Sequence, residues 1–302
     1  MAGSIITAGT NAWAAWRSLP RPERVRISGW AVWIAAVTLV FVRPLTALLS
    51  LARENELHSH IPLIPLVTAY LLFIQRGTLP APGRSSILGT LAMSSVALAA
   101  AGWGITSPEL SATDRIAVMT FAYAALVAGG GFLFLGAKWM SAAAFPIALL
   151  IFIVPLPDAA VEWLERASVQ ASADVAAWMF RATGTPLLRE GTIFALPTIV
   201  VEVARECSGI RSSWVLFITS LVASHMFLKS PWRRLVLVAF VIPLGIVRNG
   251  VRILTIGLLC VHVGPHMIDS FIHHRGGPIF FVLSLGPLFL LLTWLRRRDR
   301  VA

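Results

Sequence analysis

Charged side chains are scarce in this chain: Asp, Glu, Lys and Arg make up only 13% of its 302 residues, against roughly 25% in soluble globular domains. Together with a hydrophobic fraction of 57%, this excludes a disordered chain, a nucleic-acid-binding domain and an ordinary cytosolic enzyme. Cysteine is scarce too, because two cysteines are too few for a disulfide scaffold. The net charge of +11 is spread between long apolar runs, which indicates a multi-pass membrane protein with basic cytoplasmic loops.

Long apolar runs dominate the sequence, and about 20 such residues are needed to span a bilayer. The first run begins near Gly29 and no obvious small-residue cleavage site follows it, so we expect an anchor rather than a cleaved signal peptide. We expect eight spans, at about 28–49, 59–75, 86–105, 116–136, 139–156, 210–228, 234–259 and 278–295. The sequence therefore predicts an all-α polytopic bundle that forms a single integral membrane domain over 1–302, with short cytoplasmic tails at about 1–27 and 296–302.

Basic residues are distributed unevenly between the spans, and basic loops favour the cytoplasmic side. With the N-terminus in the cytoplasm, 14 of the 25 basic residues lie in cytoplasmic loops and tails. They are Arg17, Arg21, Arg24, Arg26, Arg76, Arg84, Lys138, Lys229, Arg233, Arg234, Arg296, Arg297, Arg298 and Arg300. Of the 14 acidic residues, only Glu23 and Asp299 fall on that side. Eight spans then place both termini in the cytoplasm and the stretch 157–209 outside.

The stretch 157–209 is the longest without a span. Asp158 is suited to begin a helix after the helix-breaking sequence VPLP. Over 158–182 apolar residues recur at helical spacing: Val161, Trp163, Leu164, Val169, Val175, Trp178 and Met179. This predicts an amphipathic helix that either lies in the outer membrane interface or packs on the bundle. The β-branched residues of 192–203, interrupted by Pro197, predict a short hairpin or extended loop.

Polar side chains in or near a bilayer are costly, and four clusters of them fall on the outer side under this topology. Their sequences are RECSGIR at 205–211, RNGVR at 248–252, HHRGG at 273–277 and, more weakly, HSH at 58–60. Arg248 and Arg252 share one face of the seventh span, and Asn249 lies beside Arg252 at i+3. Guanidinium groups in a span should face the protein interior or a wet cavity.

A cysteine, a histidine and arginines on one side of a membrane suggest nucleophilic catalysis, in which a thiolate attacks. Arg211 lies four residues after Cys207 and can reach back towards it if a helix begins there. The amides of a turn at 208–209 would favour the thiolate, and a second arginine can stabilise an oxyanion. The adjacent Glu206 opposes the thiolate unless its carboxylate points away or is paired.

Each of these features has a simpler structural explanation. Cys207 could be a small apolar residue, or could form a disulfide with Cys260 in an oxidising compartment. The two arginines of the seventh span could pair with Glu202 or Glu206. The paired histidines at 273–274 could be interfacial loop residues, and those at 58 and 60 could cap or line the second span.

The motifs, in this order and on this topology, resemble the exosortase/archaeosortase family of membrane cysteine transpeptidases. The resemblance covers about 25–295 and rests on ECSGIRS at 206–212, NGVRI at 249–253 and the segment 273–277 before a Phe-rich last span. SHIPLIP at 59–65, before a Tyr-containing helix, also resembles an early family signature, and so does PLP at 155–157. The family usually has glycine after the early Ser-His, where this chain has Ile61.

The resemblance implies a catalytic Cys207, Arg252 and His273, with the neighbouring His274 as an alternative histidine. It further implies cleavage of exported proteins at C-terminal sorting signals, which consist of a short motif such as Pro-Glu-Pro, a membrane helix and a basic tail. The thioester is then resolved by an acceptor amine or by water. No cofactor or metal is implied, and the partners are membrane-anchored protein substrates and the lipid bilayer. We expect further roles in catalysis or substrate binding for five residues: His60, Glu206, Arg211, Arg248 and Asn249.

The expected location is the bacterial inner membrane, with both termini cytoplasmic and the active site on the periplasmic face. Two other functions fit the same composition. A membrane glycosyl- or polymer-transferase for exopolysaccharide or lipid-linked substrates would use the outer arginines to bind phosphate, and Cys207 would then be structural. In a transporter or channel-like subunit, Arg248 and Arg252 would line a path.

Overall fold

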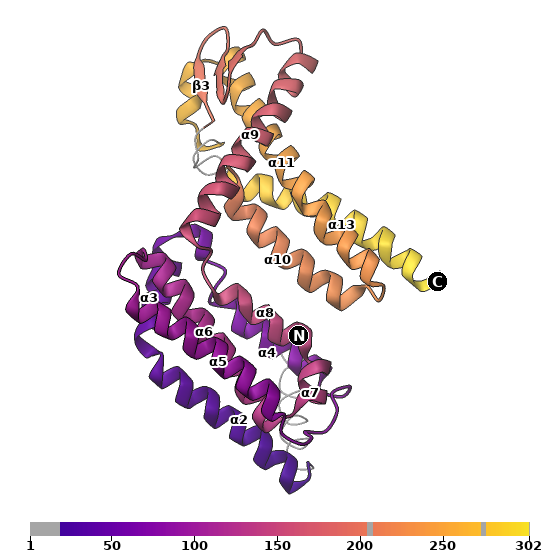
Figure 1. The fold of residues 1–302 in the computed structure, drawn as a ribbon. Helices are drawn as coiled ribbons and strands as arrows, with labels where there is room; N and C mark the ends of the chain where they lie inside the picture. The colour runs from indigo at the N-terminus through magenta and orange to yellow at the C-terminus, as the bar shows by residue number, and fades with distance from the viewer. Residues whose placement is uncertain (1–18, 204–207, 273–275, 302) are drawn as a thin grey trace. The chain divides into compact units, whose positions relative to one another are not determined.

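The computed structural model describes residues 19–203, 208–272 and 276–301, and it is predominantly helical, as the sequence predicts (Figure 1). Six described helices are long and apolar enough to span a membrane. The number rises to eight if each of two bent helix pairs counts as one span, namely Arg21–Val40 with Val42–Glu54 and Ala144–Ile153 with Asp158–Ala182. The chain is therefore an all-α polytopic membrane protein. Contacts within it define two compact units, Met1–Asp158 and Ala159–Ala302.

The first unit is built entirely from helices in its described part. They are α2 (Arg21–Val40), α3 (Val42–Glu54), η1 (Glu56–His58), α4 (Leu63–Gln75), α5 (Ile87–Thr106), α6 (Ala112–Phe134), α7 (Ala137–Ala142), α8 (Ala144–Leu149) and η2 (Leu150–Ile153). Helices α5 and α2 both pack on α6. The Trp33 indole on α2 donates to the Leu126 carbonyl at 2.8 Å, and a Cβ on Gly130 would lie 2.1 Å from the Trp33 ring. Glycine on α6 thus allows the close helix approach that is typical of membrane bundles.

Two of the expected spans are not continuous helices, and a proline explains each break. The run 28–49 divides at Phe41 into α2 and α3, which meet at 77°. The run 139–156 divides into α7, α8 and η2. Because proline clashes with the carbonyl four residues before it, Pro44 disfavours a continuous helix through Val40, and Pro146 one through Ala142.

The second unit combines helices with a small sheet. Its elements are α9 (Asp158–Ala182), β1 (Leu188–Glu190), β2 (Ile193–Ala195), β3 (Val200–Glu202), α10 (Ile210–Phe227), α11 (Pro231–His262), η4 (Pro265–Asp269) and α13 (Gly277–Val301). Helices α10, α11 and α13 pack on one another. The 32 residues of α11 correspond to about 48 Å, which exceeds the roughly 30 Å hydrocarbon core of a bilayer.

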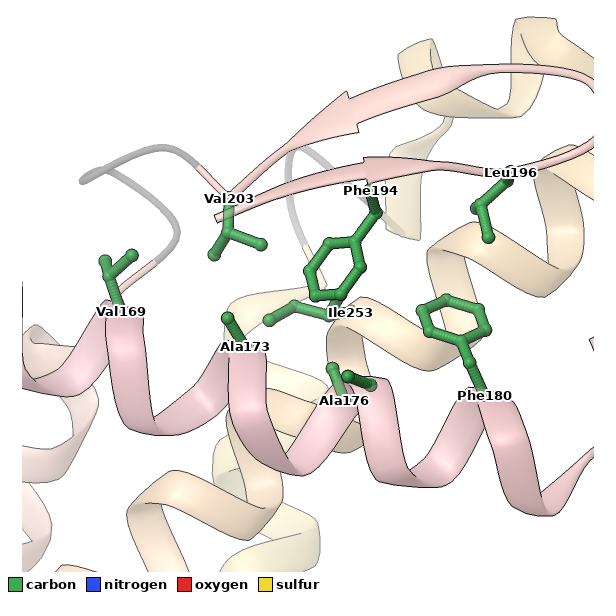
Figure 2. Close-up of a cluster of buried hydrophobic side chains, with 9 residues drawn as sticks. Val169, Ala173, Ala176, Phe180, Phe194, Leu196, Val203 and Ile253 are labelled. Carbon is green, nitrogen blue, oxygen red and sulfur yellow. The ribbon is translucent and has the colours of Figure 1, made fainter. Parts of the chain in front are cut away.

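The two halves of α11 belong to two different hydrophobic cores. Its first half contributes Leu237, Val241 and Leu244 to a core shared with α10 and α13. Its second half contributes Ile253 to a core shared with α9 and the sheet, which Figure 2 shows. Residues 245–252 therefore lie at the junction between the two cores.

Helix α9 has the bounds that the sequence predicts, 158–182, but a different face is packed. Trp163 and Trp178, which the hydrophobic pattern groups with the apolar side, are 66% and 67% exposed. The buried face is made mainly of small residues, with Val169 and Phe180 near its ends: Ser172, Ala173, Ala176 and Ala177. Small residues pack closely against the neighbouring backbone, so they decide which face is buried. The location of α9 in the membrane interface stays a prediction.

The expected hairpin at 192–203 is confirmed as β2 and β3, which belong to a three-stranded antiparallel sheet in the order β1-β2-β3. The additional strand β1 pairs Glu190 with Ile193 across a two-residue turn in which Gly191 has φ +60°. Arg189 ties β1 to α9, because its Nη2 lies 2.7 Å from Oδ1 of Asp174.

A glycine on α11 sets the distance between this helix and α9. A Cβ on Gly257 would lie 2.4 Å from Cζ of Phe180, whose ring is 1% exposed. We expect Gly257→Ala to lower the free energy of unfolding by about 1–3 kcal/mol through overpacking, measured by thermal unfolding in detergent. Gly102→Ala on α5 is the matched control, because nothing lies within 4 Å of its Cβ position. Equal destabilisation by both variants would contradict this account.

Candidate functional site

Arg248 lies at the junction on α11 and binds the beginning of α10. Its side chain is buried, with 7% exposed. Its Nη2 donates to the carbonyl oxygen of Gly209 at 2.9 Å and to Oγ of Ser213 at 2.9 Å. These two bonds bring together two of the sequence clusters, RNGVR at 248–252 and the end of RECSGIR at 205–211.

The turn before α10 has the form that the sequence predicts. Gly209 is the N-cap of α10 and has φ +70°, a left-handed conformation that favours glycine. A Cβ at this position would lie 3.2 Å from Nη2 of Arg248 and 3.2 Å from Oδ1 of Asn249, so glycine also makes room for both side chains. Ser168 on α9 donates to the carbonyl oxygen of Ser208 at 2.7 Å. The turn that follows Cys207 in the sequence is thus held from two sides, by α9 and by α11.

Two hydrogen-bond donors beside this turn have no acceptor among the described residues. Asn249 is 2% exposed, and its Nδ2 and the Nη1 of Arg248 are buried without a hydrogen-bond partner in the described part of the chain. A buried donor that lacks an acceptor costs about 1–3 kcal/mol. The site therefore retains a capacity to bind oxygen atoms that its described residues do not use.

The other arginines of the two clusters are less buried. Arg211 is exposed in the first turn of α10, which begins at Ile210 as predicted. Arg252 is half-buried one turn after Arg248 on α11. The sequence spacing predicts that Arg248, Asn249 and Arg252 lie on one side of α11. In the structure Arg248 and Asn249 are buried and Arg252 is partly exposed.

Several predicted site residues lie outside the described residues. They are Glu206, Cys207, His273 and His274. Their predicted roles stay predictions, and the alternative of a disulfide between Cys207 and Cys260 is not supported, because Cys260 is free. Cys260 itself is a buried, free cysteine, and its Sγ lies 4.0 Å from the carbonyl oxygen of Pro265.

His60 belongs to the first unit, whereas Arg248 belongs to the second. It is 7% exposed, and its Nδ1 lies 3.0 Å from the carbonyl oxygen of Leu57. This contact supports the structural explanation, in which the histidine stabilises the beginning of its span. The neighbouring His58 is 2% exposed.

Ser168 and Ser213 also belong to the site, although no sequence motif marks either residue. Ser213 follows Gly209 by four residues, so the start of a helix at Ile210 places its hydroxyl one turn from that glycine. Ser168 gave no comparable signal, because its contact with Ser208 spans 40 residues of sequence.

The fold and this site define a class: a multi-pass helical membrane protein in which a buried arginine on a long helix binds the turn that ends a Cys-Ser-Gly motif. A family model for transmembrane exosortases (Exosortase_EpsH) matches residues 52–290. The chain belongs to this family, and the match includes α10, α11 and the junction between the two cores. No curated protein and no solved structure shows a significant match.

Proposed function

We propose that the chain is a membrane cysteine protease or transpeptidase that cleaves C-terminal sorting signals of exported proteins. Its family is that of the transmembrane exosortases. The observation that carries the proposal is the bond of Arg248 Nη2 to the Gly209 carbonyl oxygen at 2.9 Å. Through it, α11 binds the turn two residues after Cys207, and the same helix carries Arg252 one turn further on. The turn at Gly209, which follows the proposed nucleophile in the sequence, thus packs on the helix that carries Arg252.

In the proposed reaction the thiolate of Cys207 attacks the carbonyl carbon of the scissile peptide bond. His273 accepts the thiol proton and later donates it to the leaving amine, and Arg252 stabilises the oxyanion. The peptide C–N bond breaks and a thioester forms on Cys207. An acceptor amine or water then attacks the thioester carbonyl carbon and the C–S bond breaks. The product is an amide to the acceptor or a free carboxylic acid, and the proton lost by the nucleophile returns to the Cys207 thiolate.

The other polar residues of the site have supporting roles in this proposal. Arg248 positions the turn, and the unused Nδ2 donor of Asn249 binds a substrate oxygen atom. Arg211 is exposed beside the same turn and suits an acidic residue in the sorting motif. We place the site at the periplasmic surface of the bacterial inner membrane, where the membrane helix of the substrate would fix the depth of cleavage.

A trapping experiment tests the covalent step directly. The purified full chain is mixed with a sorting-signal peptide labelled on the N-terminal side of the cleavage site and is quenched in acid. We expect the label to stay on the protein in a hydroxylamine-sensitive thioester at Cys207, identified by mass spectrometry. If the enzyme transfers the cleaved chain to an amine, the rate of label release should rise with the concentration of added amine. If the enzyme hydrolyses the thioester, that rate should not depend on the amine concentration. Absence of label from Cys207 during turnover would refute the proposal.

A further inference from the structure

A basic cavity lies where α10 ends and α11 begins, next to the last turns of α13. Its volume is about 220 Å³, and it is lined by Phe227, Lys229, Arg296 and Asp299. Helices α10 and α11 are both candidate membrane spans, and only residues 228–230 connect them. This end of the bundle must therefore lie at a membrane surface. Arg248 is 17 residues further along α11 than its first residue, Pro231, or about 25 Å away, so the cavity is a separate site.

The acidic residue that lines the cavity is already engaged within the protein. One carboxylate oxygen of Asp299 accepts from the backbone amide of Lys229, and the other forms an ion pair with Arg233. Asp299 also lies beside the first turn of α11, where a carboxylate is favoured by the helix dipole. Its charge is therefore matched, and the side chains of Lys229 and Arg296 give the cavity lining an excess of positive charge.

Aromatic residues place the cavity at the depth of lipid headgroups. Trp232 in the first turn of α11 is 68% exposed, and Trp294 near the end of α13 is 53% exposed. Tryptophans of this kind collect at membrane–water interfaces. Inside the cavity, the Arg296 guanidinium lies 5.4 Å from the centre of the Phe227 ring, so the lining presents an apolar surface next to its charges.

We propose that this cavity binds the phosphate of an anionic phospholipid. Lys229 and Arg296 donate to the phosphate oxygens, as both residue types do in phosphate sites. Phe227 contacts the start of the acyl chains. Basic pockets between membrane helices are suited to such headgroups, and the proposal is independent of the catalytic function proposed above.

The test uses the purified full chain in a neutral detergent, titrated with phosphatidylglycerol. Thermal unfolding and native mass spectrometry report stabilisation and bound lipid. We expect phosphatidylglycerol to raise the unfolding temperature and phosphatidylcholine to leave it unchanged. Lys229→Gln and Arg296→Gln should each weaken the apparent affinity about fivefold, because one basic residue near an anionic lipid contributes about 1 kcal/mol.

Arg297→Gln is the matched control, because it removes the same charge at the next position of α13, outside the cavity lining. We expect it to change the affinity by less than about twofold. An equal loss in Arg296→Gln and Arg297→Gln would show general surface attraction and overturn the proposal. Equal stabilisation by millimolar inorganic phosphate, or by phosphatidylcholine, would also overturn it, because the site would then not select an anionic lipid.

Discussion

Replacing Cys207 by alanine should abolish cleavage of a co-expressed substrate that carries a sorting motif, a membrane helix and a basic tail. Without the thiolate no thioester forms, and loss of a catalytic nucleophile lowers turnover by at least about 10³-fold in comparable enzymes. The measurement is the ratio of cleaved to uncleaved substrate in membranes, at matched levels of enzyme. Cys260→Ala is the matched control, because it removes the other cysteine, a buried and free one on α11, and it should leave cleavage unchanged.

Two further variants separate the proposed activity from the alternatives that the composition permits. Arg252→Ala should lower the cleavage rate by about 10²–10³-fold, the usual loss when an oxyanion donor is removed. A polymer transferase predicts that Cys207→Ser leaves its product nearly unchanged. A transporter predicts charge-dependent flux through Arg252 variants and no acyl-enzyme. Normal cleavage by either Cys207→Ala or Arg252→Ala would exclude the peptidase.

Hydropathy predicts the membrane fold well because every span needs an uninterrupted apolar run. It is less informative where proline divides such a run, and Pro44 and Pro146 mark the two expected spans that the structure divides. In both cases the run stays apolar on average despite the proline. Helix bounds are therefore better predicted from hydropathy together with the carbonyl clash that each proline imposes on the preceding turn.

The packed face of α9 could not be predicted from hydrophobic spacing alone. In a soluble protein, Trp163 and Trp178 would mark the buried side, but in this chain the residues of α9 in the core shared with the sheet are mainly alanines. Close helix–sheet approach depends on small side chains, which carry little hydrophobic signal. Strand β1 had a local signal in Gly191, which is suited to a two-residue hairpin turn.

The candidate site was predictable where its residues share one helix. The i, i+4 relation of Arg248 and Arg252 follows from sequence, and so does the turn at Gly209. The direction of each side chain does not follow, because it depends on contacts between residues far apart in the chain. The sequence offers pairing with Glu202 or Glu206 as an alternative for Arg248, whereas in the structure its Nη2 binds the carbonyl oxygen of Gly209 and Oγ of Ser213.

Arg248→Met should lower kcat by about 100-fold and change KM little. Methionine has a similar length but cannot donate, so the turn at Gly209 loses the support of α11. A shift of about 1 Å in a catalytic group can cost 10² in rate. The Gly209 carbonyl keeps its bonds from the Ser213 amide at 3.0 Å and from Ser212 Oγ at 3.1 Å. The turn should therefore loosen rather than unfold, and the unfolding temperature should change little.

Arg248→Lys and Ser213→Ala extend this test. In Arg248→Lys, the lysine can reach the Gly209 carbonyl but lacks the second guanidinium nitrogen. Ser213→Ala removes the Ser213 hydroxyl, which is only one of the two acceptors of Arg248 Nη2. Both variants should therefore lose activity to an intermediate degree.

Arg166→Met is the matched control, because this exposed arginine on α9 pairs only with Glu162 among the salt bridges described, at 3.1 Å, and a surface pair contributes about 0–1 kcal/mol. A rise in KM with unchanged kcat in Arg248→Met would instead indicate that Arg248 binds substrate without positioning the turn. Wild-type kinetics in that variant would remove Arg248 from the mechanism.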